Sequence, residues 1–243
     1  MENNLIIGRK PVYEALIANK EIEKIYILFN SKSDIINKIK IEAKKKKIPI
    51  TELPKNKFEK YGDSNVTQGV VALISSIKYY NLQHLIEYTK NNKPNIMLLL
   101  EEIQDTHNLG AILRTCESFG IKSIVITKNN SAVINQTVFK TSAGAVSHLF
   151  IHKTHSLQNV IQELKDNGFW IYASTLNEAE DIKKVQKNFP IAIIMGNEEK
   201  GVKTSTIKNS DYKIKIPMMS KFDSLNVSVA NGIILYEFTR NLD

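Results

Sequence analysis

Apolar and polar positions alternate in short blocks through the first third of the chain. Helical spacing and β-type runs predict a helix over 11–19, a strand over 24–29 and a helix over 33–47. The segment IPITEL (48–53), a short helix near NKFEKYG and a strand over 69–77 follow. Ser33 and Asp34 stand just before the apolar positions of the second helix, which is a typical helix start. Residues 1–78 are therefore predicted to form a small α/β domain.

From residue 95 onward, uninterrupted apolar segments alternate with helical ones. The apolar segments are NIMLLLEEI, SIVITK, FWIYASTL, IAIIMGN and YKIKIPM. Strands of this kind, separated by helices, predict a mostly parallel sheet that is buried on both faces. The stretch 79–94 is interpreted as a linker containing a short helix, and 95–243 as the second domain. Ligands of such sheets bind beyond the carboxyl ends of the strands, so the loops after the first, fourth and fifth strands become candidate sites.

The first of these loops leads into DTHNLGAILRTCESFG, residues 105–120. Asn108 is predicted to cap the helix, and Gly110 to allow close backbone approach. Arg114 is one of only three arginines among 33 Lys and Arg residues. A guanidinium offers a planar fork of donors for carboxylate or phosphate, which lysine lacks. An exposed ion pair with Glu117, three residues later, is the alternative role for Arg114.

The other two loops carry acidic, amide and hydroxyl side chains. GNEEKG (196–201) combines two glycines with Glu198 and Glu199, and an ordinary surface turn is the alternative interpretation. Ser224 is predicted to cap the last helix, with Asn226 and Ser228 in its first turn. Free N–H groups at a helix start suit a carboxylate or hydroxyl ligand, although capping alone would also explain these residues.

Charge adds an expected partner. The chain has a formal net charge of +8, and residues 1–78 hold 15 Lys and Arg against 9 Asp and Glu. This balance favours a polyanionic partner such as nucleic acid. The run Lys44–Lys47 is either part of that contact or a solvated helix end. The chain begins without a basic-then-apolar signal pattern and has no long apolar run, so we expect a cytoplasmic protein that does not bind membranes.

The remaining candidates are expected to be structural. Cys116 and Trp170 lie in apolar segments and are predicted to be core residues. His148, His152 and His155 lack neighbouring carboxylates or cysteines, and no metal site is expected. His107 lies in the first loop, where it could contact substrate. No dinucleotide-binding or P-loop motif is present.

Taken together, the three loops resemble the motifs of the SpoU/TrmH family of RNA ribose 2′-O-methyltransferases, in the SPOUT superfamily. The matching segments, in the family's order and spacing, are DTHNLGAILRTCESFGI, IMGNEEKGV and IPMMSKFDSLNVSVANGIILYEFTR. The segments IIGRKPVYEAL and TQGVVA resemble landmarks of the family's small substrate-binding domain of L30e-like fold. That extra domain makes the chain most similar to the RlmB-type branch, which methylates a guanosine in the peptidyl-transferase region of 23S ribosomal RNA.

The resemblance implies a C-terminal SPOUT domain with a deep trefoil knot that forms the S-adenosylmethionine pocket, and a homodimer whose sites are completed by the partner chain. The cofactor would contact Gly196, Ile216 and Leu225. The catalytic neighbourhood would be formed by Asn108, Arg114, Glu198, Ser224 and Asn226. Relatives commonly have His where Thr67 stands and Gly where Glu199 stands, which are the two departures in this chain.

The same resemblance implies transfer of a methyl group to a ribose 2′-oxygen. The counterpart of Arg114 has been cast as the base of this reaction, but an arginine side chain stays protonated at neutral pH. We therefore expect Arg114 to hold a substrate phosphate and stabilise the developing alkoxide. Alternatives are methylation of transfer RNA or of another ribosomal nucleotide, and a catalytically silent RNA-binding or ribosome-assembly factor.

Overall fold

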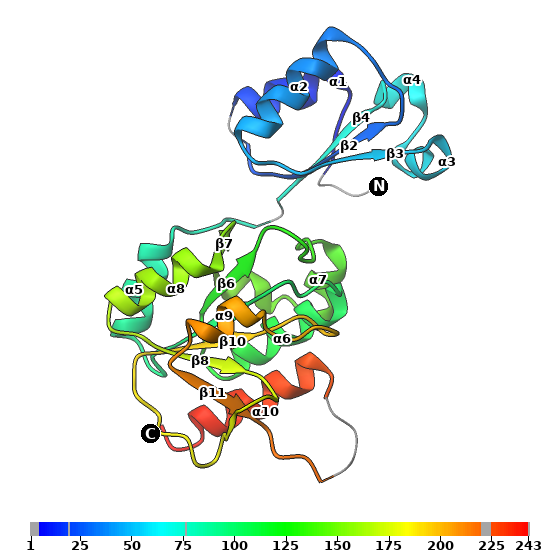
Figure 1. The fold of residues 1–243 in the computed structure, drawn as a ribbon. Helices are drawn as coiled ribbons and strands as arrows, with labels where there is room; N and C mark the ends of the chain where they lie inside the picture. The colour runs from blue at the N-terminus through cyan, green and yellow to red at the C-terminus, as the bar shows by residue number, and fades with distance from the viewer. Residues whose placement is uncertain (1–4, 19, 76, 220–224, 243) are drawn as a thin grey trace. The chain divides into compact units, whose positions relative to one another are not determined.

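The computed structural model of the chain divides into two units, Met1–Ser76 and Ile77–Asp243 (Figure 1). It describes residues 5–18, 20–75, 77–219 and 225–242. Each unit has its own sheet and its own cluster of buried side chains, so each is described by itself.

The first unit is a four-stranded sheet in the order β1-β4-β2-β3, with helices packed on one face. Only the β2–β3 pair is parallel. Ile6, Ala72, Ile25 and Ile50 form one row across the four strands and belong to the buried cluster beneath α1 and α2. The elements are β1 (Leu5–Ile7), α1 (Arg9–Ile17), β2 (Ile22–Leu28), α2 (Asp34–Lys45), β3 (Ile50–Leu53), α3 (Lys55–Phe58), η1 (Glu59–Tyr61), α4 (Ser64–Thr67) and β4 (Val70–Ile74).

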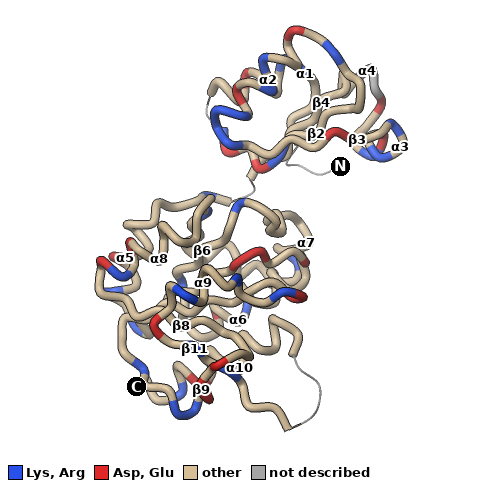
Figure 2. The backbone as a smooth tube through the Cα atoms, viewed as in Figure 1, with Lys and Arg blue, Asp and Glu red and all other residues tan. Residues whose placement is uncertain are grey.

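The helices and strands predicted for this region are all present, the short helix near NKFEKYG as α3 and η1, and the segment 48–53 contains β3. Ser33 caps α2 as its sequence predicts, with its Oγ accepting a hydrogen bond from Ile36 N at 3.2 Å. Figure 2 shows the run of lysines where α2 ends, and the last two helical residues of α2 are Lys44 and Lys45. Cations at this end of a helix interact favourably with its dipole. The run Lys44–Lys47 therefore has a structural role at the end of α2, and a nucleic-acid contact stays a prediction.

The second unit is built on a seven-stranded sheet in the order β7-β6-β5-β10-β8-β11-β9, and every neighbouring pair is parallel. The predicted parallel sheet is thus confirmed. Its elements are α5 (Leu82–Asn91), β5 (Ile96–Leu100), α6 (Thr106–Ser118), β6 (Ser123–Thr127), α7 (Gln136–Thr141), η2 (Ala145–His148), β7 (Phe150–Thr154), α8 (Leu157–Asp166), β8 (Trp170–Ser174), β9 (Glu180–Asp181), β10 (Ile191–Met195), α9 (Thr204–Lys208), β11 (Tyr212–Lys215) and α10 (Val227–Thr239).

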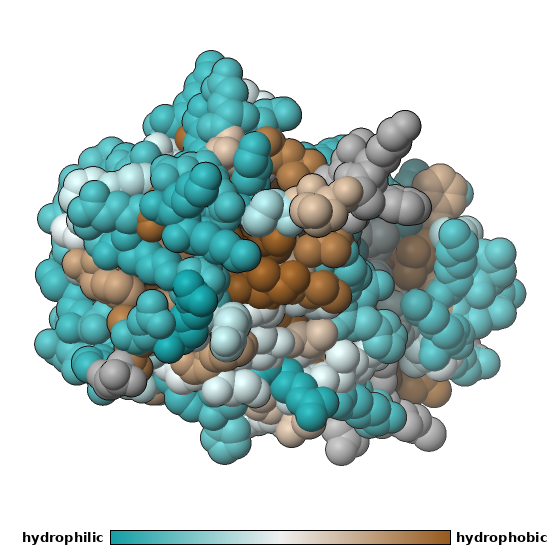
Figure 3. Space-filling model, turned by 90° about the horizontal axis from the view of Figure 1, so that it is seen from below, coloured by the Kyte–Doolittle hydropathy of each residue, from teal (hydrophilic) through white to brown (hydrophobic). Residues whose placement is uncertain are grey.

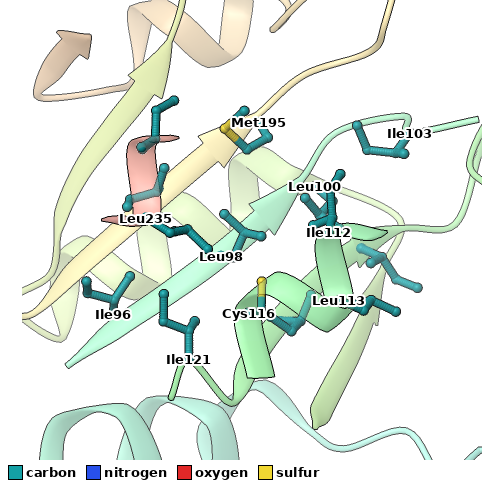
Figure 4. Close-up of a cluster of buried hydrophobic side chains, with 14 of the residues drawn as sticks. Ile96, Leu98, Leu100, Ile103, Ile112, Leu113, Cys116, Ile121, Met195 and Leu235 are labelled. Atoms are coloured by element: carbon teal, nitrogen blue, oxygen red, sulfur yellow. The ribbon is translucent and has the colours of Figure 1, made fainter. Parts of the chain in front are cut away.

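Helices cover both faces of this sheet, so its central strands are buried throughout. Alternate residues of β5 face opposite sides: Leu98 joins a cluster with α6 and α10, whereas Leu99 joins one with α5 and α8. Figure 4 shows part of the first cluster, which includes Leu98 of β5, Leu113 and Cys116 of α6 and Leu235 of α10. A sheet buried on both faces requires the continuous apolar strands seen in the sequence.

Two predictions for this unit are wrong. The stretch 79–94 contains the predicted helix, α5, but it is not a linker, because α5 packs Leu85 and Ile86 into the core of the second unit. Trp170 is 43% exposed rather than core, because it is the first residue of β8 and lies at the strand's amino end, where its ring packs beside Tyr212. None of the described helices combines the length and apolarity that a membrane span requires.

Candidate functional site

The helix after β5 begins three residues earlier than the sequence indicated. Asp105, not Asn108, caps α6: its carboxylate accepts hydrogen bonds from His107 N at 2.6 Å and Asn108 N at 2.9 Å. Asp105 satisfies the free N–H groups of the first turn, so the side chain of Asn108 is released for other contacts. The close approach expected at Gly110 is to α7, since a Cβ there would lie 2.6 Å from Thr141 Cβ.

A chain of hydrogen bonds joins the three predicted loops through Asn108. Its Nδ2 donates to Glu198 Oε1 at 3.2 Å, and its Oδ1 accepts from Asn226 Nδ2 at 3.0 Å. Asn226 in turn caps α10, accepting hydrogen bonds from Ser228 N and Oγ at 2.9 and 2.6 Å. Each side chain therefore has a defined direction of donation, which orients both amides relative to the carboxylate.

Glu198 is not an ordinary turn carboxylate. Besides Asn108, it accepts hydrogen bonds from the backbone N–H groups of Gln104 and Asp105 at 3.4 and 3.3 Å, and from Asn197 Nδ2 at 3.4 Å. These four bonds are long, and together they place the carboxylate over the segment that enters α6. Its neighbour Glu199 is exposed, and its φ is not positive, so the glutamate fits this position without backbone strain.

The loop that carries Glu198 closes tightly on itself. Asn197 N donates to Gly201 O at 3.1 Å, and Gly201 N donates back to Asn197 O at 2.9 Å. A Cβ at Gly196 would lie 2.1 Å from both Gly201 C and Val202 N. Backbone atoms cannot move aside as a flexible side chain can, so this fold of the loop requires glycine at 196.

Arg114 is exposed on α6, and its guanidinium forms no hydrogen bond or ion pair with any residue that the structure describes. The alternative partner, Glu117, is bonded instead to Lys122 Nζ at 2.5 Å. The other two arginines are engaged: Arg9 Nε donates to Gln68 O at 2.7 Å, and Arg240 pairs with Glu237 at 3.1 Å. Arg114 is the arginine left available for a ligand.

Two of the remaining predicted site residues lie in the segment that follows β11 and leads to α10. Ile216 directly follows β11 and packs against the buried cluster that also holds Met195 and Val227. Leu225 is 37% exposed, just before α10. Ser224, predicted as a cap and a catalytic residue, lies outside the described residues; the observed cap is Asn226.

Other reactive side chains have structural surroundings. Cys116 is fully buried, and its burial raises the pKa of the thiol far above its ordinary value, which makes the thiol inert. His152 Nδ1 lies 2.9 Å from Tyr80 O. Across the described part of the chain, no three His, Cys, Asp or Glu side chains converge as a metal site. His107 is exposed, with Nδ1 3.5 Å from Thr141 Oγ1.

At one end of the first unit, the segments around Gly8, Leu28 and Gly69 lie side by side, which the sequence did not predict. Gly8 N donates to Val70 O at 3.0 Å, and Leu28 N donates to Gly69 O at 2.9 Å. The next residue, Phe29, is 60% exposed. Thr67, by contrast, is fully buried behind this end, so its departure from the family pattern affects packing rather than the surface. Phe29 stands out as a candidate contact residue because its large apolar side chain is exposed, and exposure cannot be read from the sequence.

These features define a class: a two-unit α/β protein with a polar site beyond the carboxyl ends of a parallel sheet. Two family models match the chain, "SpoU rRNA Methylase family" over residues 95–236 and "RNA 2'-O ribose methyltransferase substrate binding" over residues 5–80. The chain belongs to the SpoU rRNA methylase family. It is an RNA methyltransferase, as the resemblance of the three motifs implied.

Relatives resemble either nearly the whole chain or about two thirds of it. A Staphylococcus aureus protein described as a putative TrmH family tRNA/rRNA methyltransferase is 36% identical over 99% of this chain and 97% of its own. The AdoMet-bound rRNA methyltransferase of Sinorhizobium meliloti has the same fold, with a TM-score of 0.63, 21% identity and coverage of 99% and 88% of the two chains. The A. aeolicus TrmH/SpoU tRNA modifying enzyme has a TM-score of 0.57 and 33% identity, covering 65% of this chain and 81% of its own.

Proposed function

We propose that the chain methylates the ribose 2′-oxygen of a guanosine in the peptidyl-transferase region of 23S ribosomal RNA. The observation that carries the proposal is the hydrogen-bonded group of Asn108, Glu198 and Asn226, which unites the three motifs at one edge of the sheet. The ribosomal substrate is favoured by the unit over residues 5–80, which matches a substrate-binding family. The A. aeolicus tRNA modifying enzyme, in comparison, covers only 65% of this chain.

The residues at this edge suit S-adenosylmethionine, which when bound supplies a methyl group activated on a sulfonium. Backbone groups of the loop that begins at Gly196 are brought close together by its tight closure. Half-buried Ile216 and exposed Leu225 add apolar surface, which suits the adenosine. We propose a trefoil knot around this pocket. Its support is that β10 lies between β5 and β8 while α10, after the more distant β11, returns to pack on α6.

In the proposed mechanism, the chain's residues align the ribose and stabilise charge. S-adenosylmethionine would supply the methyl group to the ribose 2′-oxygen and leave as the neutral thioether, and the hydroxyl proton would leave through a neighbouring group or water. Arg114 binds a substrate phosphate and donates to the developing alkoxide. Asn108, Glu198 and Asn226 hold the loops that position the reactants.

Arg114 is proposed to act in the partner's site of a homodimer. Its guanidinium forms no hydrogen bond or ion pair with Glu198 or Asn108 of its own chain, although all three are proposed members of the catalytic neighbourhood. The surface of α10 supports such a dimer, since Val229, Ile233 and Tyr236 are 50%, 38% and 57% exposed at helical spacing. Figure 3 shows apolar surface gathered in the view from below, the side on which α10 lies in Figure 1. Such a contiguous patch is typical of an interface.

Replacing Ile233 with glutamate is expected to convert the dimer to monomers of 27.6 kDa, because a carboxylate would be desolvated in the apolar interface. Light scattering on a sizing column measures the mass, and turnover should fall with it. Ile41→Glu is the matched control, since Ile41 is 55% exposed on α2 of the first unit. A monomeric wild-type protein, or an Ile233→Glu dimer, would contradict the interface.

Phe29 is proposed to stack on an unpaired RNA base at the exposed end of the first unit. Phe29→Ala is expected to weaken RNA binding by about 5- to 100-fold, the range for one lost stacking contact. Affinity for S-adenosylmethionine should not change. Binding is measured by fluorescence anisotropy for RNA and by calorimetry for the cofactor. Phe189→Ala, at a 37% exposed phenylalanine of the second unit, is the control; equal RNA affinity of both variants would refute this role.

The function itself is tested by incubating the protein with methyl-labelled S-adenosylmethionine and, separately, large-subunit RNA, assembled subunits and transfer RNA. Label at a single guanosine 2′-oxygen of the peptidyl-transferase region is the expected result. Label only in transfer RNA would contradict the ribosomal substrate and identify transfer RNA as the substrate. RNA binding without any label would instead favour the assembly-factor alternative.

A further inference from the structure

Glu101 is a buried carboxylate that the proposed mechanism does not use. It directly follows β5 and is 2% exposed. Burying a carboxylate costs free energy unless strong hydrogen bonds replace those to water. Hydrogen-bond donors of the protein must therefore offset the hydration that the Glu101 carboxylate loses on burial.

Both carboxylate oxygens of Glu101 are bonded to the segment that begins α9. Oε2 accepts from Lys203 N at 2.8 Å, and Oε1 accepts from the hydroxyl of Thr206 at 2.7 Å. Thr206 is itself fully buried. Lys203 is the N-cap of α9, and its side chain makes no capping bond. Glu101, which follows β5, accepts from the Lys203 N–H as the glutamate of a capping box ordinarily does from within the helix.

The backbone of the same residue holds the other end of the loop. Glu101 N donates to Met195 O, the last residue of β10, at 2.9 Å. One residue thus fastens both ends of the 196–202 loop. Because the loop is closed internally between Asn197 and Gly201, fixing its ends also fixes the position of Glu198.

We propose that Glu101 is a positioning residue that sets the shape of the 196–202 loop for S-adenosylmethionine. The inference rests on the proposed placement of the cofactor against that loop. Charge-assisted hydrogen bonds are stronger and shorter than neutral ones, and two of them on one carboxylate restrict the loop more than a single contact would. The consequence is a pocket formed before the cofactor binds, which lowers the entropy cost of binding.

The test compares Glu101→Gln and Glu101→Asp with the wild type. Aspartate is shorter by one methylene and should lose the reach to Lys203 N and Thr206 Oγ1, whereas glutamine keeps the length and loses the charge. We expect the KM for S-adenosylmethionine to rise by about 10- to 100-fold in Glu101→Asp and less in Glu101→Gln, as for loss of hydrogen bonds to a charged group. The kcat at saturating cofactor should change little. A merely structural role would reduce the folded fraction, and hence kcat, while leaving KM unchanged.

Glu102→Gln is the matched control, because among the described residues the Glu102 side chain bonds only the half-exposed ammonium of Lys203 and the amide of Asn130. Hydrogen exchange at amides 197–206 separates two ways of failing. Faster exchange with an unchanged KM would show that Glu101 anchors the loop but that the cofactor binds elsewhere, which overturns the proposed placement. Unchanged exchange and unchanged KM in Glu101→Asp would overturn the anchoring role itself.

Discussion

Replacing Arg114 with lysine is expected to lower turnover by about 100-fold or more, and alanine by up to about 1000-fold, the range for removing a donor to a developing oxyanion. Lysine keeps the charge but not the planar fork that binds phosphate and alkoxide together. The loss should be catalytic rather than structural, because an exposed side chain without a partner contributes little to folding. Single-turnover methylation at saturating RNA and cofactor measures the effect.

The matched control is Arg240→Lys. Arg240 is exposed near the C-terminal end of α10 and pairs with Glu237, a contact that lysine can also make. Its turnover should equal that of the wild type. Near-wild-type turnover of Arg114→Lys would show that only charge matters at position 114. It would contradict the role of the planar guanidinium in binding phosphate and alkoxide together. Mixed dimers of Arg114→Ala with an inactive Glu198 variant add a second readout, since activity reappears only if Arg114 serves the partner's site.

Gly196→Ala is expected to destabilise the protein by roughly 3 kcal/mol or more, or to abolish cofactor binding by displacing the loop. The added Cβ would lie 2.1 Å from two backbone atoms of Gly201 and Val202, and no rotamer can relieve that overlap. Urea denaturation gives the free energy of unfolding, and calorimetry gives the affinity for S-adenosylmethionine.

Gly168→Ala separates this steric effect from ordinary glycine substitution. Gly168 has φ +82, and no atom lies within 4 Å of the position that a Cβ would take, so alanine there should cost only about 1–2 kcal/mol of backbone strain. It should also bind cofactor normally. If Gly196→Ala unfolded no more easily than Gly168→Ala and bound cofactor equally well, the tight closure of the 196–202 loop would not be required.

The predictable part of this fold consists of segments whose neighbours in sequence decide their structure. The apolar runs at 96–100 and 191–195 became central strands, and Ser33 began its helix as expected. Prediction failed where distant groups decide the outcome. Asp105 displaced Asn108 as the cap of α6. The stretch 79–94 contains the expected helix but is not a linker, because the apolar face of that helix packs into the core of the second unit. Trp170 is exposed because its strand begins there.

The candidate site shows the same division. Its loops could be located because parallel strands all present their carboxyl ends at one edge of a sheet. The importance of Glu101 could not be seen, because its partners Lys203 and Thr206 are about a hundred positions away and nothing local marks a residue as their acceptor. The exposure of Phe29 was equally invisible.

By itself, the sequence determined which residue types this protein has for its chemistry and in which loops they occur, because strand periodicity and ordered motifs are local properties. Only the tertiary structure decided which of them meet. Asn108 lies 90 residues from Glu198 and 118 from Asn226, yet it is bonded to both. The tertiary structure also showed that the Arg114 side chain has no hydrogen-bond or ion-pair partner among the described residues, whereas Arg9 and Arg240 each have one. Contacts at such separations depend on how a whole sheet and its helices pack, which no stretch of sequence encodes alone.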